Sequence, residues 1–148
     1  MRNLLLFLHI AGTIFWMGGM AFMVLALRPA LHARQEPPVR LPLVVEVLRR
    51  FFVVVIASIA LLLGTGVPLL LQVPGGQAPA GWHAMAGLGV VMMLVFGHIY
   101  FGPWRRLKAA VAQQAWPEGG KRMAQITLLV KVNLTLGWVA IAAVLLWR

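Results

Sequence analysis

The stretch NLLLFLHIAGTIFWMGGMAFMVLAL, residues 3–27, contains no Asp, Glu, Lys or Arg. A helix of this length rises about 1.5 Å per residue, which is enough to cross roughly 30 Å of hydrocarbon. Three further long apolar stretches follow at residues 51–71, 82–102 and 124–147. A backbone in lipid has to satisfy its own hydrogen bonds, and the alternation over roughly ten residues that marks barrel strands is absent. We therefore expect four transmembrane helices.

The composition supports the same fold class. Of the 148 residues, 61% are hydrophobic and only 11% are charged, whereas a soluble domain carries about 25% charged residues. So little charge cannot cover a soluble surface, and the length is that of one domain. We predict an all-α integral membrane four-helix bundle, a single domain over residues 1–148. The chain has no cysteine, which excludes disulfides, thiolate zinc sites and cysteine nucleophiles.

The connections between the predicted helices carry most of the charge. Residues 28–50 and 103–123 together hold ten Lys and Arg, whereas only Arg2 and Arg148 lie at the termini. The positive-inside rule then places both connections in the cytoplasm and both termini on the outer, periplasmic side of a bacterial inner membrane. The net charge of +10 is thus a topology signal. We expect the lipid bilayer, and no nucleic acid, as the partner of this surface.

Local signals refine these connections. The uncharged middle connection, residues 72–81, is predicted to be a turn, and it contains Pro74, Gly75, Gly76 and Pro79. Four prolines, Pro29, Pro37, Pro38 and Pro42, are expected to break the helix between the first two spans. Residues 41–50 are expected to extend the second helix. Residues 104–116 are amphipathic and are expected to prolong the third helix or lie along the headgroups, before Gly119 and Gly120 interrupt the chain.

Ionisable residues inside a membrane span are costly, so each of them is a candidate functional residue. At about 1.5 Å per residue, His9 in the first span and His83 in the third differ in depth by only about 5 Å. His98 lies about 18 Å deeper than His9, so we group it with Lys131 and His32. The sequence predicts one outer histidine pair and one inner polar cluster.

One face of the first span combines several of these candidates. Its members lie within about 40° of one line along a helix; they are His9, Thr13, Trp16, Met20 and Met23. We predict that this face points into the bundle. In the last span, Lys131 shares a face with Thr127 and Trp138, and Asn133 lies near a second face.

Two kinds of cofactor suit these residues. Imidazoles that face each other in a four-helix bundle hold a b-type haem, in which case His9 and His83 are the axial ligands and His98 binds a second centre or a propionate. The same imidazoles, together with the thioethers of Met20 and Met23, suit Cu(I).

A third possibility involves no cofactor. The chain is then an accessory or assembly protein in which polar groups such as Lys131, Trp16 and Asn133 lock the helix packing. The sequence contains no Ser–His–Asp set, phosphate loop or paired carboxylates, so it assigns no catalytic residue and no reaction.

The segment FLHIAGTIFWMGGMAF, residues 7–22, and the following LRPAL, residues 27–31, resemble the first helix of the copper resistance protein D (CopD) family. In that family a Leu-His pair is followed by Trp-x-Gly-Gly and an Arg-Pro boundary. The later segments GWHAMAGLGVVMMLVFGHIYFGPWRRL, residues 81–107, and VNLTLGW, residues 132–138, look like the same small branch. Larger CopD proteins are associated with moving copper across the inner membrane, so the resemblance implies copper binding or transport.

The chain is also distantly similar to HemJ-type protoporphyrinogen oxidases. The residues that match the patterns of their first and third helices are His9, Trp16, Gly18, Gly19 and His98. Those proteins bind a b-type haem, so the resemblance implies His9 as an axial ligand. They also use a lysine at the start of the second helix, where this sequence has Arg49 and Arg50. This difference argues against porphyrinogen oxidation.

The sequence therefore supports three hypotheses for the function. The first is a b-type haem protein with a membrane redox role. The second is copper binding or transport, in which the ion moves inward by binding in turn to His9, Met20, Met23 and His98. The third is a cofactor-free accessory protein. An electron-transfer or copper-handling protein is the expected partner in the first two, and a homo-oligomer stays open.

Overall fold

A computed structural model describes residues 1–74 and 77–147 of the chain. It contains four helical segments that are long and apolar enough to cross a membrane. The first is continuous through α1 (Arg2–Phe22), η1 (Met23–Leu27) and α2 (Arg28–Arg34); the second is α3 (Pro37–Leu71); the third joins α4 (Ala80–Phe101) to α5 (Pro103–Ala112); the fourth is α6 (Trp116–Leu146). The described residues contain no strand. The predicted all-α membrane four-helix bundle is confirmed.

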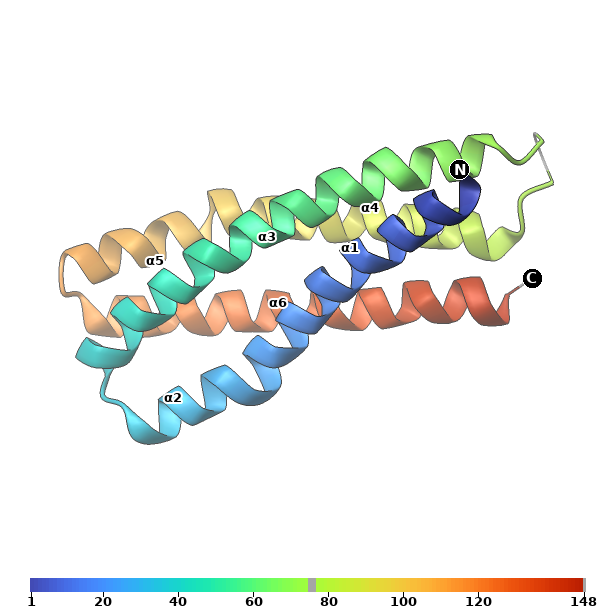
Figure 1. The fold of residues 1–148 in the computed structure, drawn as a ribbon. Coiled ribbons are helices and arrows are strands. Elements are labelled where there is room, and N and C mark those ends of the chain that lie inside the picture. Colours follow the sequence, from blue (N-terminus) through green and yellow to red (C-terminus); the bar gives the residue numbers. More distant parts are fainter. Residues whose placement is uncertain (75–76, 148) are drawn as a thin grey trace.

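The four segments lie side by side in an elongated bundle (Figure 1). The main packing pairs are α1 with α3, α4 with α6, and α5 with α6. Both ends of the chain and the α3–α4 connection lie at one end of the bundle, which we call the terminal end. The opposite end holds α2, α5 and the starts of α3 and α6; we call it the basic end.

The two connections at the basic end are much shorter than the sequence indicated. Residues 28–50 and 103–123 are mostly helical, and the helices are separated there only at 35–36 and 113–115. Pro37 stands in the first turn of α3, where a missing N–H costs nothing because no partner exists within the helix. Pro29 lies within the continuous first segment, directly after the π-helical turn η1, and does not end it. Pro42 lies inside α3 and does not end it. The four prolines therefore leave a single break, at Gln35 and Glu36.

Three further local predictions have mixed outcomes. The extension of the second helix through residues 41–50 is confirmed, and α5 continues the third segment beyond the bend at Gly102. Gly119 and Gly120 lie inside α6 and do not interrupt it, so that prediction was wrong. Of the predicted turn at 72–81, Gly75 and Gly76 lie outside the described residues, as does Arg148.

An aromatic cluster joins the two packing pairs toward the basic end. Phe52 on α3 meets Phe96 on α4 edge to face, with ring centroids 5.4 Å apart, and meets Trp104 on α5 in the same way at 5.1 Å. All three rings are buried. Such pairs contribute about 0.5–1.5 kcal/mol beyond the burial of their surface, so they fix α3 against the third segment.

At the terminal end, close backbone packing takes the place of large side chains. The Gly81 N–H on α4 donates to the Trp147 carbonyl at 3.1 Å. A Cβ added to Gly81 would collide with the carbonyl oxygens of Ala143 and Trp147. Backbone atoms cannot move aside as a flexible side chain does, so this contact between α4 and α6 requires glycine.

We expect Gly81→Ala to destabilise the folded protein by about 1–3 kcal/mol, the usual cost of overpacking. Gly87→Ala on the same helix is the matched control, because an added Cβ there meets nothing within 4 Å. Since alanine is the better helix former, this control should be neutral or stabilising. Thermal unfolding in detergent, followed by circular dichroism, measures both. Equal melting temperatures for the two variants would contradict the close contact.

Candidate functional site

The inward face predicted for the first span is present in the inner half of that span. Trp16, Met20 and Met23 are 3%, 2% and 7% exposed and belong to the bundle core. His9 and Thr13, nearer the terminal end, are half-buried. The side chains of this face are therefore more buried toward Met23 than at His9.

His9, on α1, packs against α3. Its Nδ1 lies 3.0 Å from the Oγ1 of Thr65, which is itself buried. A Cβ added to Gly66 would lie 2.9 Å from the His9 Cε1 atom, so the imidazole ring rests directly on that glycine. Thr65 and Gly66 thus supply both the hydrogen bond and the space that position this ring.

The hydrogen-bond partners also fix the tautomer of His9. The Thr65 hydroxyl donates to the Leu61 carbonyl at 2.7 Å. A hydroxyl has a single hydrogen, so its oxygen has to act as the acceptor toward His9. In the neutral imidazole, the Nδ1–H of His9 is then the donor, and Nε2 has the lone pair. A histidine oriented in this way through one nitrogen is the usual arrangement for a metal ligand through the other.

A second group of residues lies deeper, where α1, α4 and α6 approach one another. Met17 on α1 and Met92 on α4 are both buried. A Cβ added to Gly137 on α6 would collide with the Met17 sulfur and would lie 3.2 Å from the Met92 Cε. The two thioether side chains therefore lie together against Gly137, where the absence of a side chain leaves them room.

Asn133 lies one helical turn before Gly137 and is 1% exposed. Its Nδ2 donates to the Met92 carbonyl at 3.2 Å. This bond fixes the orientation of the amide, because a carbonyl accepts only from the nitrogen. The Asn133 Oδ1 is buried and has no hydrogen-bond partner among the described residues. Leaving such an acceptor unpaired costs about 1–3 kcal/mol.

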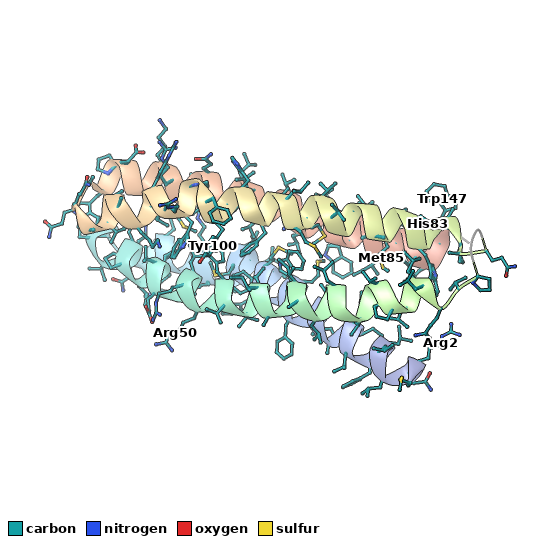
Figure 2. All side chains as sticks on the ribbon, turned by 90° about the horizontal axis from the view of Figure 1, so that it is seen from above. Arg2, Arg50, His83, Met85, Tyr100 and Trp147 are labelled. Atoms are coloured by element: carbon teal, nitrogen blue, oxygen red, sulfur yellow. The ribbon has the colours of Figure 1, made fainter. Side chains whose placement is uncertain are left out.

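The other polar residues predicted for a site lie outside the bundle core. His83, His98 and Lys131 are exposed, and so is His32 on α2. His83 lies on α4 near the terminal end, and the amino-terminal part of α1 lies on the other side of α3 from α4 (Figure 2). The structure does not bring His9 and His83 together. It also leaves His98 and Lys131 without a common buried centre.

Met17 and Met92 are the two core residues that the sequence reasoning missed. Met17 stands one turn before Met20, and Met92 and Asn133 lie near the middle of their spans. Spacing and depth could therefore have indicated Met17 and Met92 as candidate residues. What the sequence does not contain is the fact that Gly137 faces both methionines.

The chemistry of this arrangement is that of soft donors. The described residues contain no group of three or more His, Cys, Asp and Glu able to hold a metal ion. Buried thioether sulfur and the buried Asn133 amide oxygen lie within the bundle, and the half-buried His9 adds one oriented imidazole. Thioethers select Cu(I) among biological metals, whereas carboxylates and carbonyls alone suit Mg²⁺ and Ca²⁺.

Comparison with known proteins gives the family. The family model described as "Copper resistance protein D" (CopD) matches residues 45–147, more than half of the chain. An uncharacterized protein from Aquifex aeolicus (strain VF5) is 32% identical over 115 residues, which are 77% of this chain and 77% of that protein. No solved structure was found to match. The chain is a small multi-pass membrane protein that belongs to the copper resistance protein D family.

Proposed function

We propose that the protein carries Cu(I) through the membrane bundle, with the thioethers of Met17 and Met92 forming the central binding position. These two buried side chains, which lie together against Gly137, carry this proposal because thioether sulfur is a ligand that Cu(I) prefers. Asn133, whose Nδ2 is bonded to the Met92 carbonyl, adds a buried Oδ1 without a partner in the described residues, which a water molecule or an ion at this position would satisfy. Membership of the copper resistance protein D family supports copper as the ion.

Further thioethers extend from this position toward the basic end. Met20 and Met23 follow Met17 at intervals of three residues along the inward face. Met23 and Met123 of α6 line one small hollow. A series of weak positions suits transport better than one tight site, because an ion has to leave each position as well as enter it.

His9 is the proposed outer position. It lies eight residues from Met17, about 12 Å along a helix, so the two cannot bind the same ion. Its free Nε2 makes it a ligand in its own right. If both termini face outward, as the positive charge of the basic end indicates, His9 is the first of these positions that an ion from outside reaches.

The haem hypothesis has less support. A b-type haem with two imidazole ligands needs both rings on opposite faces of one iron. His9 packs on α3, and the exposed His83 lies on α4 across the bundle. Cu(I) places no such requirement on His83 or His98, so copper is the function that the geometry supports best.

We expect the purified protein to bind Cu(I) in mild detergent, and Met17→Leu and Met92→Leu each to weaken the affinity about tenfold or more. Leucine fills a similar volume but has no sulfur. Asn133→Leu should weaken the affinity less, because it removes an amide oxygen and leaves both thioethers in place. Competition with a chromogenic Cu(I) chelator under reducing conditions measures the affinity, and X-ray absorption detects the copper–sulfur bonds.

Met93→Leu is the matched control for this series. Met93 is the neighbour of Met92 on α4, is only partly buried and packs against the core, so the same substitution there should leave the affinity unchanged. Wild-type affinity in a Met17→Leu, Met92→Leu double variant would contradict the central position. A Soret band in a sample that binds no Cu(I) would instead favour the haem hypothesis.

For His9, we expect Cu(I) flux into proteoliposomes to fall severalfold in His9→Ala, with binding at the central position retained. Thr65→Val should lower the flux in the same direction, because it removes the acceptor that orients the imidazole. Thr65→Ser keeps the hydroxyl and should behave like the wild type. A flux that is equal in all four proteins would show that His9 serves only helix packing.

A further inference from the structure

A cavity of about 300 Å³ opens at the basic end, between α2, the start of α3 and the start of α6. Its polar side chains are Arg28, His32 and Arg40, and its apolar ones include Leu41, Val44 and Met123. Arg28 directly follows the apolar run of the first span. The cavity therefore lies at the depth where lipid headgroups meet the hydrocarbon.

The cavity has a surplus of positive charge. None of the described residues that line it is acidic. Two of the three carboxylates of the chain are already engaged, Glu46 by Arg49 and Arg50, and Glu118 by Arg122. In the described part of the chain, Arg28 has no ion pair, and the guanidinium of Arg40 donates to the Gln35 carbonyl and has no carboxylate partner. A half-buried guanidinium without a carboxylate partner favours an anionic ligand.

An apolar hollow adjoins the same residues. It shares Arg28 and Met123 with the cavity and is otherwise lined by side chains such as Leu48, Phe51 and Val130, between η1, α3 and α6. Its volume of about 10 Å³ is the space of a single water molecule, so it holds no ligand of its own. Its lining continues the apolar wall of the cavity from Arg28 and Met123 to Val130 on α6.

The π-helical turn explains how one helix supplies both surfaces. The Arg28 N–H bonds to the Met23 carbonyl, five residues earlier, and Arg28 therefore stands one turn above Met23. In a regular α-helix, residues five apart lie about 140° apart around the axis. The extra residue turns Arg28 to the side of the apolar hollow that Met23 also lines. Such single π-turns are frequent at functional sites.

We propose that this cavity binds an anionic phospholipid, whose phosphate is held by Arg28 and Arg40 and whose acyl chain lies against the apolar walls of the cavity, such as Leu41, Val44 and Met123. A charged pocket joined to an apolar surface matches an amphiphile better than a free anion. Basic pockets between transmembrane helices are the usual sites for phosphate-bearing headgroups. The lipid bridges α2 to α3 and α6, which diverge at this end (Figure 1). This site is independent of copper and stands or falls separately from the transport proposal.

The test uses the full chain in a neutral detergent after removal of lipid. Three ligands are added in turn, phosphatidylglycerol, phosphatidylcholine and inorganic phosphate, and the melting temperature and the lipid retained in native mass spectrometry are recorded. We expect phosphatidylglycerol to raise the melting temperature and to be retained at least tenfold better than phosphatidylcholine. Inorganic phosphate should have little effect, since it has no acyl chain to lie against the apolar walls of the cavity.

Two variants and one control locate the site. Arg28→Gln with Arg40→Gln removes the charges, and Ala124→Trp fills the cavity from an exposed position on its wall while leaving both arginines in place. Both should lose the preference for phosphatidylglycerol. Arg105→Gln with Arg106→Gln removes the same charge from the exposed face of α5. This control should retain the preference for phosphatidylglycerol.

Two results would overturn the proposal. If the α5 control loses the preference as fully as the cavity variants, the lipid is attracted by general charge and not by this cavity. If inorganic phosphate alone reproduces the stabilisation, the ligand is a free anion and not a lipid.

Discussion

Close contact between helices is the constraint on which the rest of this structure depends. In lipid, helix association gains nothing from removing apolar surface from water, so it relies on van der Waals packing and a few hydrogen bonds. Glycines provide that contact at several levels: Gly19 lies under Phe51, Gly66 under His9, Gly137 under Met17, and Gly81 against the end of α6. The pairs α1–α3 and α4–α6 contain these contacts, and His9, Met17 and Met92 lie where a glycine leaves room for them.

The sequence was sufficient to predict the number of helices, because length and hydropathy alone decide whether a segment can span a bilayer. It was not sufficient to predict which helices are neighbours. Depth along the membrane normal can be counted in residues, and on that basis His9 and His83 were placed together. Position around the bundle cannot be counted in this way. It depends on which surfaces pack, and here α1 packs on α3, so that His9 contacts Thr65.

The same distinction explains the outcome for the methionines. Helical periodicity identified the face that contains Met20 and Met23, and both are buried. It did not identify Met17 and Met92, whose common feature is a shared contact with Gly137 on a third helix. The prolines misled in a related way. Pro37 is accommodated in the first turn of α3, whereas Pro29 follows the π-turn η1 and Pro42 lies inside α3, and neither ends its helix. The sequence does not show which prolines a helix accommodates, because that depends on the local backbone and on the contacts around it.

The first helical segment contributes residues to each of the proposed binding sites. It presents His9 near the terminal end, Met17, Met20 and Met23 within the bundle, and Arg28 at the basic end. In a regular α-helix, Met23 and Arg28 would lie about 140° apart around the axis, because they are five residues apart. The π-turn at η1 changes that register with one additional residue. Such a turn gives up regular hydrogen bonding and is retained only where surrounding contacts support it. In this protein its result is that Met23 and Arg28 line the same hollow, so the last thioether of the segment and the cationic cavity are neighbours.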